Sequence, residues 1–309
     1  MPVNSSQIDN QFSRLARIAI IVAVLVFIST LSFSYFFPEL DFRITLLVTG
    51  LVFFGMPHGA MDIYILSQLL RSRKQLVFGL IVYISVGLPI LFLWPFYPTF
   101  CFIFFLFYSL IHFADSDMQD RIFSTKQNVI EFLSRLNLPF CLPFIFYRNE
   151  TVGLVKSIHP EVNILVIESV FLFLGFTSLF FVILHTASGL LRLLRNFHEA
   201  DISFIEPLVI TLLFIFVQPL YAFGIYFCFI HSIKHMINIF HKVNIHFPIM
   251  ILPYWLIPLI GLPILIFFHS ENTVLLGSKM FQYIFLVLSS IALPHALLIR
   301  FAKSKFMIN

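Results

Sequence analysis

The stretch Gln75–Ala114, QLVFGLIVYISVGLPILFLWPFYPTFCFIFFLFYSLIHFA, decides the fold, because its forty residues include no Asp, Glu, Lys or Arg. A helix needs about 20 apolar residues to cross the roughly 30 Å hydrocarbon core of a bilayer, so a run of this length predicts two membrane spans. The segment Trp94–Pro98 supplies the turn between them, because proline disfavours helix in the residue before it.

The composition of the whole chain has the same character. Of its 309 residues, 60% are hydrophobic, 17% are aromatic and only 11% are charged, whereas soluble domains carry about 25% charged residues. This leaves too little polar surface to cover a water-facing domain. We therefore expect a single integral-membrane domain over residues 1–309, and we exclude a soluble enzyme, a disordered chain and a secreted disulfide scaffold.

Apolar windows recur along the chain and predict an all-α, polytopic transmembrane helical bundle of about ten spans. One of the ten, residues 129–147, is a poor helix because it contains two charged residues and two prolines, and nine spans remain if it does not cross. The other predicted spans are 16–37, 44–66, the two halves of 75–114, 169–191, the two parts of 202–240 divided at Pro219, 243–270 and 280–299.

The basic residues favour ten spans over nine. If the N-terminus is cytoplasmic and residues 129–147 cross, most of the Lys and Arg residues fall in cytoplasmic loops, as the positive-inside bias requires. If that segment does not cross, the basic residues divide more evenly between the two sides. We therefore expect a multi-pass protein of the inner cell membrane with both termini in the cytoplasm. The same loops account for the net charge of +4, so we expect no nucleic-acid partner.

Six of the eleven histidines fall inside predicted spans, where an ionisable group is costly and marks a functional site. In the ten-span topology all six lie in the cytoplasmic half of a span that runs from outside to inside, so they share one depth. A common metal site requires such a shared depth, whereas histidines that each bond a separate neighbour do not. The six are His58, His112, His185, His231, His235 and His295.

Sequence spacing supports a metal site. His231 and His235 stand four residues apart, which places both imidazoles on one face of a helix and suits two ligands of one metal. Asp62 follows His58 by four residues and Asp115 follows His112 by three, so each carboxylate can accept the ring N–H that the metal does not use. Imidazole ligands without thiolate suit Fe(II), Zn(II), Cu(II) or Ni(II), and ligand type does not separate these metals.

Four blocks of the sequence resemble, in the same order, the signature segments of the Brp/Blh family, the membrane-embedded β-carotene 15,15′-dioxygenases of bacteria and archaea. The resemblance extends over roughly residues 44–300, and the pattern Pro-His-Gly-Ala-x-Asp is its most specific part. The blocks are Gly55–Asp62 (GMPHGAMD), His112-Phe113, Cys228–His235 (CFIHSIKH) and Pro294–Ala296 (PHA).

This resemblance implies an enzyme that cleaves β-carotene at its central double bond with O2 to give two molecules of all-trans-retinal. It implies a non-haem Fe2+ held by four histidines, with further residues close to them, while the residues that bind the substrate stay unknown. The expected partners are β-carotene, O2 and the lipid bilayer, and retinal could pass to a rhodopsin. The implied ligands are His58, His112, His231 and His235, and the residues expected around them are Asp62, Asp115 and His295.

Two other classes of membrane protein use similar residues. A proton- or metal-coupled transporter carries intramembrane His and Asp on helices broken by proline, although the two halves of this sequence show no inverted repeat. A di-haem membrane cytochrome uses histidine pairs on facing spans as axial ligands. A purified haem protein would show a Soret band, whereas a non-haem dioxygenase would contain iron without one.

Overall fold

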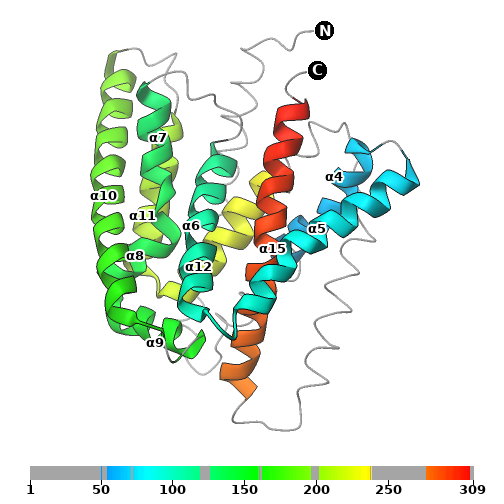
Figure 1. Cartoon of the computed structure of the whole chain (residues 1–309). Coiled ribbons are helices and arrows are strands. Elements are labelled where there is room, and N and C mark those ends of the chain that lie inside the picture. Colours follow the sequence, from blue (N-terminus) through cyan, green and yellow to red (C-terminus); the bar gives the residue numbers. More distant parts are fainter. Residues whose placement is uncertain are drawn as a thin grey trace, which may run out of the picture.

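The computed structural model describes residues 50, 54–70, 72–118, 126–158, 160, 162–195, 202–236, 238 and 276–306. These residues are largely helical and include no strand, which confirms the predicted all-α class for this part of the chain (Figure 1). The predicted spans over residues 16–37 and 243–270, and most of the first half of the span over 44–66, lie outside the described residues.

Four helices of the described part are long and apolar enough to cross a membrane, as is typical of a membrane protein. With one bent helix pair counted as a span the number is five, so the described residues account for four or five of the ten expected spans. The four are α5 (Arg73–Leu93), α6 (Pro98–Asp117), α10 (Ile164–Arg195) and, within α15 (Leu276–Phe306), the segment Phe285–Lys305.

The bent pair is the segment that the sequence marks as a poor span. It forms α7 (Lys126–Leu136) and α8 (Leu138–Phe146), and the two helix axes meet at an angle of 53°. Pro139 lies in the first turn of α8, where its missing N–H is tolerated, but its ring prevents α7 from continuing. The pair is therefore either a broken span or a re-entrant segment.

Proline also ends helices at the two other predicted places. α5 ends at Leu93, and α6 begins at Pro98. α11 (Ile205–Phe216) ends shortly before Pro219, which begins α12 (Pro219–Ile225). Both predicted breaks are therefore confirmed, and each fits the preference of proline for the first turn of a helix.

The helices form a bundle with α10 on one side and α15 on the other (Figure 1). α10 packs against α7, α8 and α11, α15 packs against α4 (Asp62–Leu69), α5 and α6, and α6 also contacts α7. The contact between α5 and α15 depends on Gly87, because a Cβ there would stand 2.4 Å from the backbone oxygen of Ser290. Small residues allow membrane helices to approach each other this closely.

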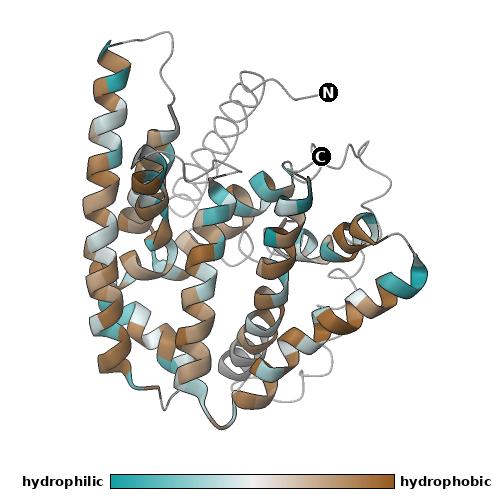
Figure 2. Cartoon of the chain, turned by 45° about the horizontal axis from the view of Figure 1, so that its top comes forward, coloured by the Kyte–Doolittle hydropathy of each residue, from teal (hydrophilic) through white to brown (hydrophobic). Residues whose placement is uncertain are grey.

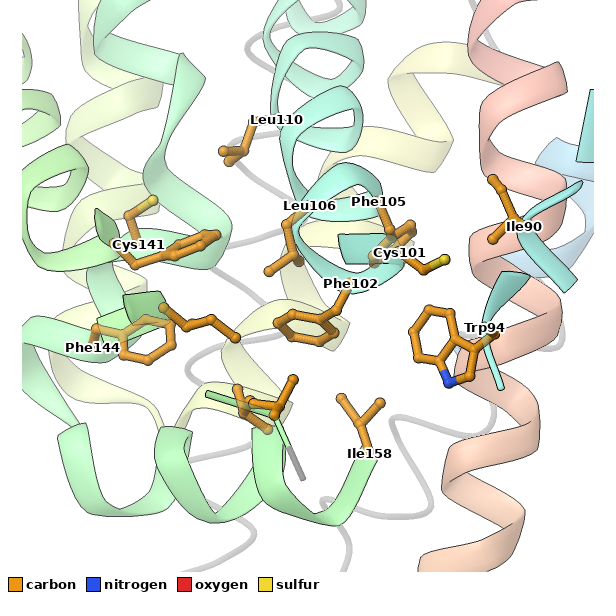
Figure 3. Packing of buried hydrophobic residues seen from close by; sticks show 14 residues of the cluster. Ile90, Trp94, Cys101, Phe102, Phe105, Leu106, Leu110, Cys141, Phe144 and Ile158 are labelled. Atoms are coloured by element: carbon orange, nitrogen blue, oxygen red, sulfur yellow. The ribbon is translucent and has the colours of Figure 1, made fainter. Parts of the chain in front are cut away.

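Apolar side chains fill the space between the two sides of the bundle. Phe102 and Phe105 of α6 lie in one buried cluster with Trp94 on the side of α15 and Phe144 on the side of α10 (Figure 3). The outer faces are apolar as well (Figure 2), and Phe173 on α10 is 71% exposed. Apolar helix faces that point away from the core are typical of contact with lipid.

Candidate metal centre

Five histidine rings form one cluster between α3 (Met56–Ala60), α6, the π-helix η4 (Tyr226–Ser232) and α15. Eight ring contacts join them, with centroid separations between 4.9 and 6.2 Å. Four of the side chains are buried and His112 is partly buried. The five are His58, His112, His231, His235 and His295.

The local backbone explains how His231 and His235 meet. The chain widens into a π-helix over Tyr226–Ser232 and returns to α-helix at Ile233. π-Helical turns are rare and frequently occur at functional sites. The two rings are nearly parallel, with 13° between their planes and 5.9 Å between their centroids, so both imidazoles lie on the same face, as their spacing predicts.

Neighbouring groups hold one nitrogen, Nδ1, in four of the five rings. The Nδ1 of His231 lies 3.1 Å from the Asp117 carboxylate, and the Nδ1 of His235 lies 3.0 Å from the hydroxyl of Ser116. The end of α6 therefore supplies both partners, on consecutive residues, to the two histidines of the His-x-x-x-His pair. Such contacts fix the orientation and the tautomer of a ligand ring.

The other two rings are held in the same way. The Nδ1 of His295 lies 2.8 and 2.9 Å from the two carboxylate oxygens of Asp62. The Nδ1 of His58 contacts the backbone carbonyl of Gly55 and lies 3.2 Å from the Ser232 hydroxyl. In each of these four rings the nitrogen that remains for another ligand is Nε2.

The Nε2 atoms themselves are the unusual feature of the cluster. Those of His112, His231, His235 and His295 are buried and have no hydrogen-bond partner among the described residues. A buried polar atom without a partner costs about 1–3 kcal/mol, so native proteins contain few of them. Four in one cluster indicate a shared ligand that binds imidazole nitrogen.

The cluster fits a metal by its donors and by the spacing of its rings. In the part of the chain that the structure describes, no group of three or more His, Cys, Asp or Glu side chains is arranged to hold a metal ion as it stands. A metal–nitrogen distance of about 2.1 Å puts the centroids of two ligand rings roughly 4.6 Å apart at right angles and roughly 6.5 Å apart when opposite. The observed separations of 4.9–6.2 Å lie in this interval, so the rings have the spacing of imidazoles that share one metal.

Two buried aspartates, one on each of two helices, hold the cluster. Asp62 accepts hydrogen bonds from His295 and from the hydroxyl of Tyr83, which lies 2.7 Å from Oδ2. Asp117 contacts His231 and accepts a hydrogen bond from the hydroxyl of Tyr226 at 2.8 Å. Each aspartate thus binds one histidine and one tyrosine.

The pairing of carboxylates differs from the one that the spacing predicts. Asp62 meets His295 instead of His58. Asp115 pairs with Lys303, 3.2 Å away, and its side chain is 38% exposed. The carboxylate that α6 brings to the cluster is Asp117, which the spacing of the histidines does not single out.

His185, the sixth histidine of the predicted group, lies elsewhere in the bundle. It is buried on α10, and α10 packs mainly against α7, α8 and α11. The five clustered histidines belong to other helices, so the predicted depth in the membrane that His185 shares with them does not bring it into the cluster.

Buried ion pairs connect Asp117 to α7. The ammonium of Lys234 donates to the backbone carbonyl of Asp117 at 3.1 Å and pairs with Glu206. Glu206 also lies 3.0 Å from Arg135, which pairs with Glu131 at the same distance. The charges that make residues 129–147 a poor span are therefore satisfied inside the protein, away from lipid.

Aromatic side chains cover one side of the cluster. The ring of Phe113 lies 4.5 Å from that of His231, and Phe227 stacks on His231 with 14° between the planes. Phe223 stacks on Phe227 with 4° between the planes and contacts Phe140. An apolar wall therefore adjoins the histidines and suits a flat, hydrophobic ligand.

Known proteins match this chain over most of its length. A family model described as "Beta-carotene 15,15'-dioxygenase" matches residues 49–303, which include all five clustered histidines. A "Beta-carotene 15,15'-dioxygenase" from Uncultured marine bacterium 66A03 is 28% identical over 264 residues, covering 81% of this chain and 90% of the relative. A "Probable beta-carotene 15,15'-dioxygenase Blh" from Halobacterium salinarum is 26% identical over 243 residues, covering 72% and 68%. No solved structure matches the chain significantly.

Proposed function

Because the chain belongs to the beta-carotene 15,15'-dioxygenase family, we propose that it cleaves the 15,15′ double bond of β-carotene with O2 and releases two molecules of all-trans-retinal. One C=C bond and one O=O bond are replaced by two C=O bonds, so the reaction consumes no further reductant. The observation that carries the proposal is the buried histidine cluster, which lies within the region that matches the family.

The proposed cofactor is a non-haem Fe(II) held by His58, His112, His231 and His235. When bound, it supplies the activation of O2. Three of these histidines have a buried Nε2 without a partner in the described residues, and His58 keeps Nε2 available because Nδ1 meets Gly55 and Ser232. Neutral imidazoles are the ligands expected for such an iron.

The protein's own residues position the metal and the substrate. Ser116 and Asp117 orient the two rings of the His-x-x-x-His pair through Nδ1. The aromatic wall of Phe113 and Phe227 excludes water from one side of the rings and offers a flat surface to the polyene. Since β-carotene has no polar group, its position depends on the shape of the apolar surface that receives it.

The proposed location is the inner cell membrane, with a multi-pass topology and both termini in the cytoplasm. β-Carotene dissolves in the hydrocarbon core, so a site within a helical bundle can receive it from the bilayer. Retinal is apolar too and could pass through lipid to a rhodopsin. The family match favours this enzyme over a transporter or a di-haem cytochrome, which the histidines alone leave open.

Expression in a bacterium that accumulates β-carotene tests this function. We expect the wild-type protein to bleach the cells and to produce retinal, measured by chromatography of lipid extracts. His231→Ala should abolish retinal, while His185→Ala, which removes a buried imidazole outside the cluster, should retain it. Orange cells that hold the wild-type protein in their membranes and contain no retinal would refute the proposal.

A further inference from the structure

His295 lies among the proposed ligands, not behind them. Its ring centroid is 4.9 Å from that of His112, 5.1 Å from that of His58 and 5.4 Å from that of His235. Its Nε2 is buried and has no partner within the described residues, like the Nε2 atoms of His112 and His235. Its position and its free nitrogen are therefore those of a ligand.

Asp62 holds the His295 ring through Nδ1. It is 2% exposed and accepts hydrogen bonds from His295 and Tyr83. This buried carboxylate therefore orients the ring so that Nε2 is the nitrogen left for a metal. A metal ion bound to the Nε2 of His295 would give this nitrogen the partner that it lacks among the described residues.

We propose that His295, oriented by Asp62 and Tyr83, is a fifth imidazole ligand of the metal. The inference rests on the proposed function, because it presupposes that the other four histidines bind iron. It assigns Asp62 to the same supporting role toward His295 that Asp117 has toward His231. The two aspartates then orient two ligand rings from two different helices.

The test uses the full-length protein, purified in detergent, stripped with a chelator and reloaded anaerobically with Fe(II). X-ray absorption at the iron edge counts the imidazole ligands, and chelator competition measures the affinity for iron. We expect His295→Ala to lose one imidazole and to bind iron at least about tenfold more weakly, and Asp62→Asn to keep the imidazoles and weaken binding about 10–100-fold. His185→Ala is the matched control, with wild-type values expected for both.

Each outcome decides the proposal. An equal number of imidazoles in wild type and His295→Ala refutes the fifth ligand and leaves the proposed function intact. A wild-type protein that neither binds iron nor forms retinal overturns both. If His295→Ala does not accumulate, Asp62→Asn decides, because an unchanged iron affinity in that variant contradicts the role of His295 and its carboxylate.

Discussion

The replacement Asp117→Asn tests how the protein holds its histidines. Asp117 is 2% exposed, and its two carboxylate oxygens lie 3.1 Å from the Nδ1 of His231 and 2.8 Å from the hydroxyl of Tyr226. Asparagine has nearly the same shape but keeps one acceptor oxygen only. It therefore cannot accept hydrogen bonds from both partners in this arrangement, and it removes a negative charge next to the cluster.

We expect Asp117→Asn to bind the metal with lower affinity than the wild type. Loss of a group that orients a ligand costs about 10–100-fold in metal affinity, which corresponds to about 1.4–2.8 kcal/mol. Tyr226→Phe should have a smaller effect, because it removes one hydrogen bond of about 0.5–1.5 kcal/mol and leaves the charge and the contact with His231.

Chelator competition on the purified proteins, loaded with Fe(II), measures the effect. Asp115→Asn is the matched control, since Asp115 lies on the same helix and pairs with Lys303, and its iron affinity should equal that of the wild type. The role of Asp117 is refuted if Asp117→Asn binds iron as tightly as the wild type, or if Asp115→Asn weakens binding as much as Asp117→Asn does.

Three further replacements probe the packing around the site. Lys234→Met should destabilise the protein by about 3–5 kcal/mol and lower its melting temperature in detergent, since Glu206 loses a buried partner. Adding Glu206→Gln to this variant should recover part of the loss. Equal melting temperatures of the single and double variants would count against the ion pair. Gly87→Ala should lower the stability of the protein by about 1–3 kcal/mol, because the new methyl group meets the backbone of α15. A methyl group added at Gly153 has no neighbour within 4 Å, so Gly153→Ala should have a higher melting temperature than Gly87→Ala. Phe227→Ala should raise the KM for β-carotene at unchanged iron content, because it removes a ring that stacks on the cluster; a lower iron content with an unchanged KM would contradict a role in substrate binding.

The sequence reveals the histidines of the site but not what holds them. Helical spacing identifies neighbours three or four residues apart, and His231 and His235 meet as it predicts. Tertiary packing instead decides which histidine each carboxylate contacts, since Asp62 bonds a histidine 233 residues away and Asp117 bonds one 114 residues away. Asp117 also lies five residues after His112 on α6, at a spacing that brings no two side chains together on a helix.

The number of spans shows a second limit of sequence reasoning. Charged residues and prolines at 129–147 predict a poor span, and the structure has a bent helix pair there. The sequence does not show that Arg135, which pairs with Glu131 one turn earlier, also pairs with Glu206 on another helix. Such internal compensation allows a charged segment to lie inside a bundle, and only the folded arrangement reveals it.

We propose that the histidine cluster carries iron-dependent cleavage of β-carotene at its central bond. The most direct measurement is the product analysis of purified, iron-loaded protein incubated with β-carotene and O2, beside the same protein stripped of metal. We predict two molecules of retinal for each β-carotene consumed, and none without iron. Aldehydes of unequal length, or retinal formation that persists after the metal is removed, would contradict the claim.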